Sequence, residues 1–404
     1  MPSWYGDAKA KMLVALTGVL LAMASGIASG TKGSSAAKAG GAALAKFEPA
    51  SGCYLGAFID FDLTLDRPYV DQNGRKRQCP TAFEEVVGKP HAMYFFYMGY
   101  GVPLPLDWVC YLRDKGKFVH IALEPNQGLD KVRDDEYLRD LADTLRMSEA
   151  KVFLRFASEM NGNWVRYHGN PKLYVEKFRL VARVMRERAP NVAMVWCPYA
   201  TPTSNIASYY PGDDAVDWVG VNLYNVTHNN NDRNKPAGHI SPLDLLRYVY
   251  DRYSARKPIM ICEYGVTHRS ATMATPVSEF AQNRIMALYK AITTKYTRVK
   301  AINYFNGNNM DAVPHRAFND YSVTNDPIVL AAYRRAIDSS HFLTAPPGVV
   351  TTPPATAAGA SDKMVTVLVC ADSKRPATSY CPEAAPRRFR AGSVPTKGCH
   401  LHRP

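Results

Sequence analysis

Strand-like and helix-like segments alternate through the middle of this 404-residue chain. Runs rich in β-branched and aromatic residues, which are typical of strands, lie at 54–60, 92–99, 118–124, 152–159, 192–198, 218–224, 259–263 and 301–305. Amphipathic stretches with helical spacing separate most of them, at 104–115, 134–147, 174–188, 243–253 and 277–296. This alternation predicts a parallel sheet with crossover helices. An open doubly wound sheet would normally carry a glycine-rich turn after its first strand, but the chain reads AFIDFDLT there, so we expect a closed (β/α)8 TIM barrel over residues 51–343.

Two glutamates stand at the ends of predicted strands that lie about 100 residues apart. RFASEMNGNW (155–164) contains Glu159, and KPIMICEYG (257–265) contains Glu263, 104 residues later. A strand and its return helix take roughly 30 or more residues, so three such units fit between the glutamates, and strands three apart face each other across a barrel mouth. Retaining glycoside hydrolysis requires such a pair, one carboxyl as acid/base and the other as nucleophile. The spacing therefore predicts a glycosidase site with Glu159 and Glu263 as its catalytic pair.

The alternation of side chains along these two strands constrains their neighbours. Arg155 shares a strand face with Glu159, and a buried arginine there requires a partner, most naturally a carboxylate. On the other strand, Ile261 and Glu263 share a face, which leaves Cys262 on the opposite one. We therefore interpret Cys262 as a packed thiol and not as a nucleophile.

Three motifs in this order resemble glycoside hydrolase family 26, the β-mannanase and lichenase family of the retaining barrel clan. RFASEMNGNW resembles its acid/base motif, YYPGDDAVDWVGVNLYN (209–225) its strand-six motif and KPIMICEYG its nucleophile strand, and the resemblance spans roughly residues 54–342. It implies that Glu159 is the acid/base, that Glu263 is the nucleophile, that Tyr224 hydrogen-bonds the nucleophile, and that no metal or organic cofactor is required. It also implies that three residues lie near the sugar: Asn161, Trp164 and Trp218.

The chain departs from the family pattern beside the predicted cleavage point. Ser158 stands where the family usually has histidine directly before the acid/base, and strand eight ends in Tyr304 and Phe305 where the clan commonly has a tryptophan floor. The aromatic pair that follows the acid/base motif is replaced by Arg166, Tyr167 and His168. Ser158, Tyr304 and Arg155 are therefore counted as candidate substrate-binding residues. Mannan is the first expected substrate, and glucan, xylan or a mixed exopolysaccharide stays open.

The sequence context of the other aromatic and histidine residues indicates which of them could contact sugar or a metal ion. Aromatic faces suit the apolar faces of pyranoses, but tryptophan is usually highly buried. Trp164, beside the motif, is the best candidate for a sugar platform, whereas Trp108 and Trp196 are expected to pack. The ten histidines lack HExxH or similar metal spacing. His228, four residues past Tyr224 in an asparagine-rich loop, is a further candidate for substrate contact.

The ends of the chain differ from the middle in composition. Lys9 and Lys11 precede an apolar run that ends in a small-residue cleavage site, so residues 1–24 are typical of a secretory signal peptide, with an uncleaved anchor as the alternative. Residues 25–50, rich in alanine, glycine, serine and lysine, predict a flexible tether. Residues 344–362, rich in proline, threonine and alanine, predict an extended linker. We therefore expect a secreted or cell-surface protein.

The eight cysteines are divided by this organisation. Export permits disulfides, and Cys53 and Cys79 are placed to close the loop after the first strand. Three others are expected to be buried thiols: Cys110, Cys197 and Cys262. The last three lie in a tail, 363–404, that is too small for an ordinary core. Its pattern, VLVCADSKRPATSYCP followed by FRAGSVPTKGCHLH, resembles the cysteine-bearing C-terminal segment of some bifunctional penicillin-binding proteins, and a zinc site with His400 and His402 is the alternative.

The formal net charge of +13 is concentrated at the ends of the chain. The first fifty residues carry five basic and two acidic side chains, and the residues from 363 onward carry eight basic and two acidic ones. Charge on the ends of an exported protein favours adhesion to an anionic wall or surface polymer, and no nucleic-acid motif is present. We therefore expect a monomeric, exported, retaining endo-β-glycanase with a polysaccharide substrate. The alternatives are a non-catalytic glycan-binding surface protein and a wall- or exopolysaccharide-remodelling glycosidase.

Overall fold

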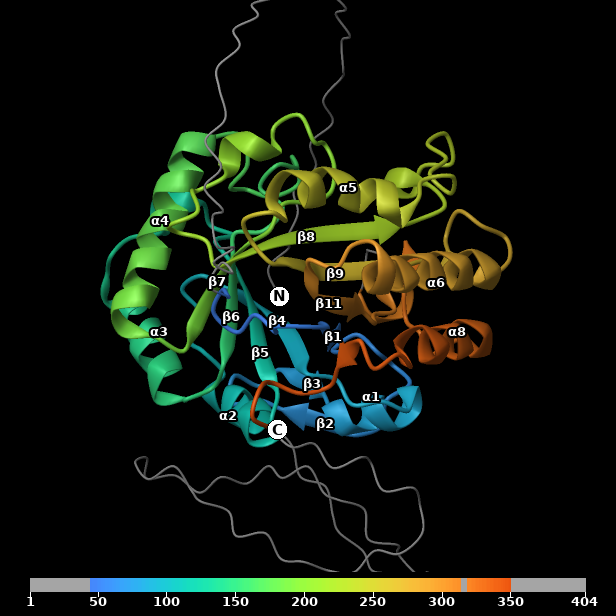
Figure 1. Cartoon of the computed structure of the whole chain (residues 1–404), viewed down its shortest axis with the longest axis horizontal. Coiled ribbons are helices and arrows are strands. Elements are labelled where there is room, and N and C mark those ends of the chain that lie inside the picture. The colour runs from blue at the N-terminus through green and yellow to red at the C-terminus, as the bar shows by residue number, and fades with distance from the viewer. Residues whose placement is uncertain (1–43, 314–317, 350–404) are drawn as a thin grey trace, which may run out of the picture.

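The computed structural model describes residues 44–313 and 318–349. Eight parallel strands pair in the order of the chain, and the last pairs with the first, so the sheet closes into a barrel (Figure 1). The barrel strands are β1 (Cys53–Phe58), β4 (Met93–Gly99), β5 (Phe118–Glu124), β6 (Val152–Phe156), β7 (Val192–Trp196), β8 (Trp218–Asn225), β9 (Ile259–Val266) and β11 (Val299–Phe305). The predicted (β/α)8 TIM barrel is confirmed.

Helices connect the strands and surround the barrel. Those of eight or more residues are α1 (Pro80–Val87), α2 (Leu106–Asp114), α3 (Glu136–Met147), α4 (Pro171–Arg188), α5 (Pro242–Tyr253), α6 (Ser278–Thr294) and α8 (Pro327–Ile337). Local sequence sets several of their starts, because proline occupies the first turn of α1, α4, α5 and α8. Four helices are also capped by a side chain that accepts a backbone N–H: Asp135, Asn170, Ser241 and Asp326. The sequence predicts five of these helices but not α1 and α8.

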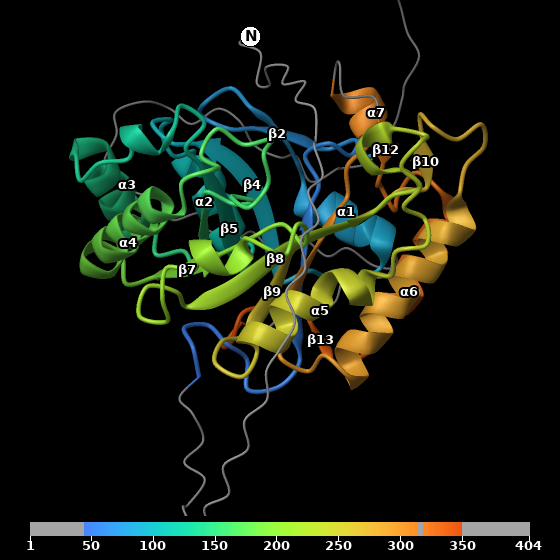
Figure 2. The ribbon, with the colours of Figure 1, turned by 90° about the horizontal axis from the view of Figure 1, so that it is seen from above.

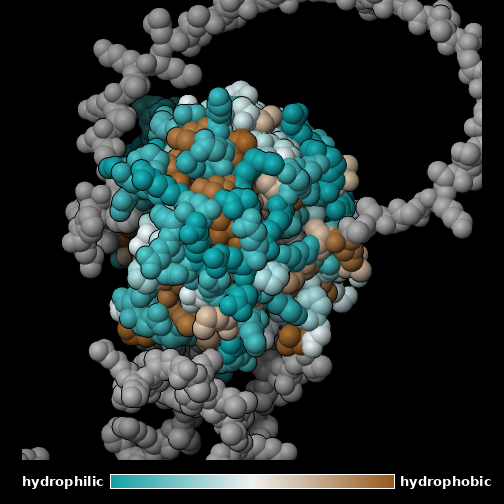
Figure 3. Space-filling model, turned by 90° about the vertical axis from the view of Figure 1, so that its left-hand side faces the viewer, coloured by the Kyte–Doolittle hydropathy of each residue, from teal (hydrophilic) through white to brown (hydrophobic). Residues whose placement is uncertain are grey.

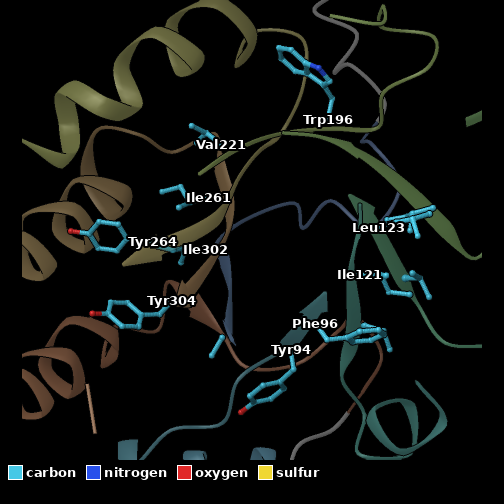
Figure 4. Packing of buried hydrophobic residues seen from close by; sticks show 14 of the residues in the cluster. Tyr94, Phe96, Ile121, Leu123, Trp196, Val221, Ile261, Tyr264, Ile302 and Tyr304 are labelled. Atoms are coloured by element: carbon cyan, nitrogen blue, oxygen red, sulfur yellow. The ribbon is translucent and has the colours of Figure 1, made fainter. Parts of the chain in front are cut away.

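The main core lies between the ring of strands and the helices. Side chains such as Leu123, Val221 and Ile261 point from the strands toward the helices (Figure 4) and belong to one buried apolar cluster. The helices turn their apolar sides to this cluster. The face over α3 and α4 is accordingly mostly hydrophilic, with small apolar patches (Figure 3).

A second apolar cluster fills the amino end of the barrel interior, where Phe118, Phe153 and Trp218 are fully buried. Phe47 packs beneath it, with its ring centroid 5.5 Å from that of Phe118 and 5.5 Å from that of Phe153. The predicted tether, 25–50, is therefore wrong at its end, because residues 44–50 close the bottom of the barrel through apolar contacts.

The start of the predicted linker also packs on the barrel. Pro346 is buried, and Lys151 Nζ donates to the carbonyl oxygen of Pro347 at 2.9 Å. The expectation of an extended spacer therefore does not hold for its first residues, 344–349. The predicted signal peptide (1–24) and the basic tail (363–404) lie outside the described residues.

The strand that carries Glu263 contains a register shift. Val221 pairs with Ile261, but Asn222 pairs with Glu263, so Cys262 is skipped. This bulge turns both Cys262 and Glu263 toward the barrel interior, whereas strict alternation places Cys262 on the opposite face. The prediction that Ile261 and Glu263 share a face is therefore wrong, because Ile261 points toward the helices. Cys262 lies on the same side as Glu263, but its thiol is fully buried among apolar side chains, as expected of a packed residue.

The expected disulfide between Cys53 and Cys79 is not formed. Cys53 is a free thiol inside β1, and Cys79, at the start of α1, has its Sγ 3.0 Å from Thr81 Oγ1. Cys197 and Cys262 are buried, as predicted, whereas Cys110 is only partly buried.

Small elements decorate the barrel. They are the pair β2 (Pro68–Val70) and β3 (Lys76–Gln78), the pair β10 (Arg269–Ser270) and β12 (Asn319–Asp320), β13 (Phe342–Leu343), α7 (Asn309–Ala312) and the short helical turns Leu129–Lys131, Ile206–Tyr209 and Asn229–Asn231. Figure 2 shows β10, β12 and α7 together beside α6. Among the helices of the described residues, none has the length and apolar character needed to span a membrane.

Candidate active site

Glu159 lies just past the carboxyl end of β6, in a backbone turn that few residues adopt. Ala157 has φ +51° and Glu159 has φ +60°, and left-handed conformations of this kind cost of order 1–3 kcal/mol each and persist only when the surroundings hold them. One such restraint is the Glu159 backbone N–H, which donates to the Cys197 carbonyl oxygen at 2.9 Å. The turn places the carboxyl group at the barrel mouth.

Two neutral donors hold the Glu159 side chain. Asn222 Nδ2 donates to Oε1 at 2.8 Å, and Trp164 Nε1 donates to Oε2 at 2.6 Å. Burial and the nearby charge of Glu263 nevertheless raise the pKa of Glu159 to about 7, against the opposing effect of those donors and of Arg155. Near neutral pH this carboxyl group therefore exists in both protonated and ionised forms.

Glu263 has the opposite environment, because positive charge and hydroxyl donors surround it. Arg155 Nη2 lies 2.6 Å from Oε1, Tyr97 donates to Oε1 at 2.7 Å, and Tyr224 donates to Oε2 at 2.5 Å. Burial and the charge of Glu263 hold the pKa of both tyrosines well above the usual range, so both remain O–H donors. Glu263 therefore has one cationic partner and two hydroxyl donors.

Arg155 and Asn222 connect the two glutamates. Arg155 is fully buried and has Glu263 as its carboxylate partner, as the sequence analysis anticipates. Its Nη1 donates to Asn222 Oδ1 at 2.9 Å, and the amide group of Asn222 in turn donates to Glu159. The Arg155 guanidinium also lies over the ring of Tyr97, 5.7 Å from its centroid. One continuous network therefore fixes both carboxylates.

Comparison with known proteins identifies this arrangement. Residues 119–241 match the model of glycosyl hydrolase family 26, a stretch that contains Glu159 and ends before Glu263. A GH26 β-mannanase from Bacteroides ovatus superposes with a TM-score of 0.52 at 14% identity, covering 73% of this chain and 90% of that one. The middle of the barrel thus matches glycosyl hydrolase family 26. The predicted glycoside hydrolase family is thereby confirmed.

The proteins to which this chain is similar bear different names. Endoglucanase H of Acetivibrio thermocellus is 26% identical over 245 residues, 55% of this chain and 25% of that protein. A β-1,3-xylanase from an Alcaligenes species is 30% identical over 148 residues, 33% of this chain and 31% of that one. An endo-β-1,4-mannanase from Cellulomonas fimi superposes with a TM-score of 0.52 at 16% identity, over 72% of each chain. The chain thus spans about a quarter to a third of the length of these curated relatives, and the structural likeness concerns the fold.

Two candidate site residues lie far from the barrel mouth. Trp218 begins β8, is fully buried at the amino end of the barrel, and donates from Nε1 to the Lys46 carbonyl oxygen at 2.7 Å. Tyr304 is fully buried outside the barrel, where it packs against Tyr264 and Tyr333 (Figure 4). Both predicted sugar contacts are therefore wrong. Trp218 lies at the amino end of β8, away from the mouth. The side chain of Tyr304 points from its strand toward the helices and not into the barrel.

Asn161 and His228 also have partners other than the two glutamates. Asn161 Nδ2 donates to the carbonyl oxygens of Tyr199 and Pro202, and its Oδ1 accepts from the Tyr199 backbone N–H, so its amide fixes the loop after β7. Its expected place near the sugar stays a prediction. His228 Nδ1 lies 2.8 Å from Thr272 Oγ1, in a loop that shares no described contact with Glu159 or Glu263.

Trp164 combines two features expected of a platform. Its side chain is 36% exposed, and its ring meets that of Tyr199 edge to face at 5.2 Å. Trp108 and Trp196 are buried and packed, as predicted. Sequence reasoning missed Tyr97 and Asn222, whose only signal is that each is a polar residue near the carboxyl end of an apolar strand.

The described residues hold no group of three or more histidine, cysteine, aspartate or glutamate side chains placed to bind a metal ion. At the mouth, Glu159 and Glu263 are carboxyl groups in different environments, and the charge of Glu263 affects the pKa of Glu159.

Proposed function

We propose that this protein is a retaining endo-β-glycanase that cleaves a β-linked polysaccharide by double displacement. The observation that carries the proposal is the contrast between its two carboxyl groups. Glu263 is buried against Arg155 and two tyrosine hydroxyls, whereas the pKa of Glu159 is raised to about 7. A carboxyl group with a raised pKa suits the acid of such a reaction, and a carboxyl group paired with a cation suits its nucleophile.

In the first step, protonated Glu159 gives its proton to the glycosidic oxygen while a carboxylate oxygen of Glu263 attacks the anomeric carbon. The bond from that carbon to the leaving sugar breaks, and a glycosyl ester forms on Glu263. The positive charge that develops on the sugar ring is stabilised by the carboxylate it faces. Glu159 is left ionised, and the Asn222 amide and Trp164 indole donors stabilise that form.

In the second step, Glu159 acts as a base. It takes a proton from a water molecule, whose oxygen attacks the same anomeric carbon and displaces Glu263. Two inversions return the original configuration at that carbon. The Arg155 ion pair and the Tyr97 hydroxyl then hold the released carboxylate for the next cycle.

The proposed substrate is an uncharged β-glycan, with mannan the first to test. Relatives are named as mannanases, an endoglucanase and β-1,3-xylanases, and the chain replaces family residues beside the cleavage point, Ser158 among them. A screen of purified protein on mannan, mixed-linkage glucan, both β-1,3- and β-1,4-xylan and bacterial exopolysaccharides would identify it.

The proposal is tested with Glu159→Ala and Glu263→Ala, and with Glu176→Ala, an exposed α4 residue, as the matched control. Loss of the acid/base slows polymer hydrolysis by about a hundredfold or more. A substrate with a good leaving group needs no acid in the first step, so with Glu159→Ala the intermediate on Glu263 accumulates and azide restores turnover. The product is a glycosyl azide of retained configuration.

Glu263→Ala should form no such intermediate and should not respond to azide with a retained product. Equal behaviour of the two variants would contradict the assigned roles. NMR can follow the configuration at the anomeric carbon of the first product formed. An inverted configuration there would contradict retention.

We also propose that the protein is exported and that its basic ends adhere to an anionic wall or surface polymer. The apolar run within residues 1–24 and the excess of basic residues from 363 onward support this. Fractionation of cells that express the full chain tests export. Co-sedimentation with anionic wall polymer at low and high salt tests adhesion, which should weaken as salt rises.

A further inference from the structure

A third carboxyl group lies at the barrel mouth. Glu124 is the last residue of β5 and shares the parity of Phe118, whose side chain faces the barrel interior. Ser158 Oγ donates to Glu124 Oε1 at 2.5 Å, and the Tyr167 hydroxyl donates to Oε2. The same Tyr167 oxygen lies 2.8 Å from the Ser158 carbonyl oxygen. A strand end and the segment after β6 thus meet at this carboxyl group.

Both residues that hold Glu124 stand where the chain departs from the family pattern. Ser158 replaces the histidine expected before the acid/base, and Tyr167 lies in the segment that replaces the expected aromatic pair. Ser158 and Tyr167 are 4% and 3% exposed, whereas Glu124 keeps partial exposure. The two departures therefore act together, because their buried hydroxyl groups fix the carboxyl group of a residue that is itself only partly buried.

Electrostatics relates Glu124 to the reaction centre. Burial raises the pKa of Glu124, Arg155, Ser158 and Tyr167 oppose that effect, and the charge of Glu263 adds to it. Glu124 therefore lies within charge range of the Arg155 and Glu263 pair, over which the sugar to be attacked must bind.

The carboxyl group has hydrogen-bonding capacity left. An ionised carboxylate offers about four acceptor positions, and Ser158 and Tyr167 occupy one on each oxygen. A rigidly held acceptor that remains open suits the hydroxyl groups of a sugar. It also disfavours a second negative charge at the same place, since like charges in contact cost several kcal/mol.

We propose that Glu124 determines substrate specificity by accepting hydrogen bonds from the sugar over Glu263, which selects uncharged or amino-bearing sugars and rejects uronates. Ser158 and Tyr167 are its positioning residues. This inference rests on the proposed glycanase function, because it needs a sugar bound at that place. It adds a substrate class, neutral rather than acidic β-glycan, and a reason for the altered residues.

The test compares kcat/KM on a neutral β-glycan that the protein cleaves with kcat/KM on the same polymer after partial oxidation of C6 to uronate. Glu124→Gln keeps the shape but removes the charge and part of the acceptor capacity. Loss of a hydrogen bond to a charged group lowers kcat/KM on the neutral polymer by about ten- to a hundredfold. The preference for neutral over oxidised polymer should fall by about tenfold or more, whereas Glu176→Gln should change neither value.

The ratio of kcat/KM on the neutral polymer to kcat/KM on the oxidised polymer also distinguishes a positioning role from a purely structural one. Ser158→Ala should lower the preference for the neutral polymer, and Ser158→Thr, which restores a hydroxyl group, should recover it. A variant that is merely destabilised loses activity on both polymers by one factor. Thermal unfolding of each variant checks that the barrel remains folded at the assay temperature.

The inference is overturned if Glu124→Gln leaves kcat/KM unchanged, or if it lowers kcat/KM on both polymers by the same factor. Failure of the glycanase proposal looks different. If the wild-type protein hydrolyses nothing, calorimetric binding of neutral and C6-oxidised oligosaccharides still measures the preference. A preference for the neutral ligand that Glu124→Gln removes would support the assignment of Glu124 without catalysis, and its absence would refute it.

Discussion

The indole of Trp164 is predicted to set the pH range of the reaction as well as to contact sugar. Its N–H donates to Glu159 Oε2 at 2.6 Å, and this hydrogen bond favours the ionised form of the carboxyl group. Trp164→Phe keeps an aromatic ring but removes the donor. The pKa of Glu159, already raised to about 7, should therefore rise further in the variant.

The size of the shift follows from the contact. A hydrogen bond to a charged group contributes about 1.5–3 kcal/mol, and 1.36 kcal/mol corresponds to about one pKa unit. Trp164 is 36% exposed, so water replaces part of the lost interaction. We expect an upward shift of about half to one unit.

The sign has a measurable consequence because the proposed first step needs Glu159 protonated. At pH 8 a carboxyl group with a pKa of 7 is about one-tenth protonated, and with a pKa of 8 about one-half. The alkaline limb of the kcat/KM profile should therefore move to higher pH in Trp164→Phe, even if the variant is slower at its plateau. Profiles between about pH 5 and 9 on a natural oligosaccharide measure the limb.

A substrate with a good leaving group provides the control. Its first step needs no proton from Glu159, so the alkaline limb should flatten for the wild type and for Trp164→Phe alike. A limb that stays in place or moves to lower pH with the natural substrate would refute the idea that the indole N–H stabilises the Glu159 anion.

Three further outcomes are expected. Arg155→Met leaves Glu263 buried without a counter-charge, so denaturant unfolding should show a loss of about 3–5 kcal/mol, and kcat/KM should fall with it; unchanged stability would deny the importance of this ion pair. Trp218→Phe removes the hydrogen bond to Lys46 at the bottom of the barrel and should cost about 1 kcal/mol of stability while kcat and KM hold, whereas a raised KM would return Trp218 to the sugar site. Truncation after Val349 keeps the described contacts, so the thermal midpoint and the turnover of soluble substrate should be unchanged. Binding to anionic polymer should fall. A less stable barrel would count against the proposed domain boundary.

Local chemistry in the sequence determined the fold class. Apolar runs of strand length and amphipathic stretches of helical length alternate through the chain, and only a few layered architectures bury both. The same patterns located Glu159 and Glu263, because strand ends can be recognised from where an apolar run stops. The sequence patterns did not predict helices α1 and α8. The amphipathic pattern of α1 extends over only eight residues.

Tertiary structure decided which side chains meet at the site. Strict alternation placed Cys262 opposite Glu263, but a bulge that arises in pairing with β8 turns both inward. Trp218 and Tyr224 stand on one strand and share a motif, yet they lie at opposite ends of the barrel, because a strand of eight residues crosses its whole height.

The contacts of the site itself depend on closure of the barrel. Asn222 meets Arg155 across 67 positions of sequence, and Ser158 meets Glu124 across 34. A sequence pattern describes a residue by its neighbours along the chain, whereas these partners come from different strands. Pairing of β5 with β6 brings Ser158 to Glu124, whereas the curvature of the sheet from β6 to β8 brings Arg155 to Asn222. The hydrogen bonds formed there fix the orientation of each carboxyl group.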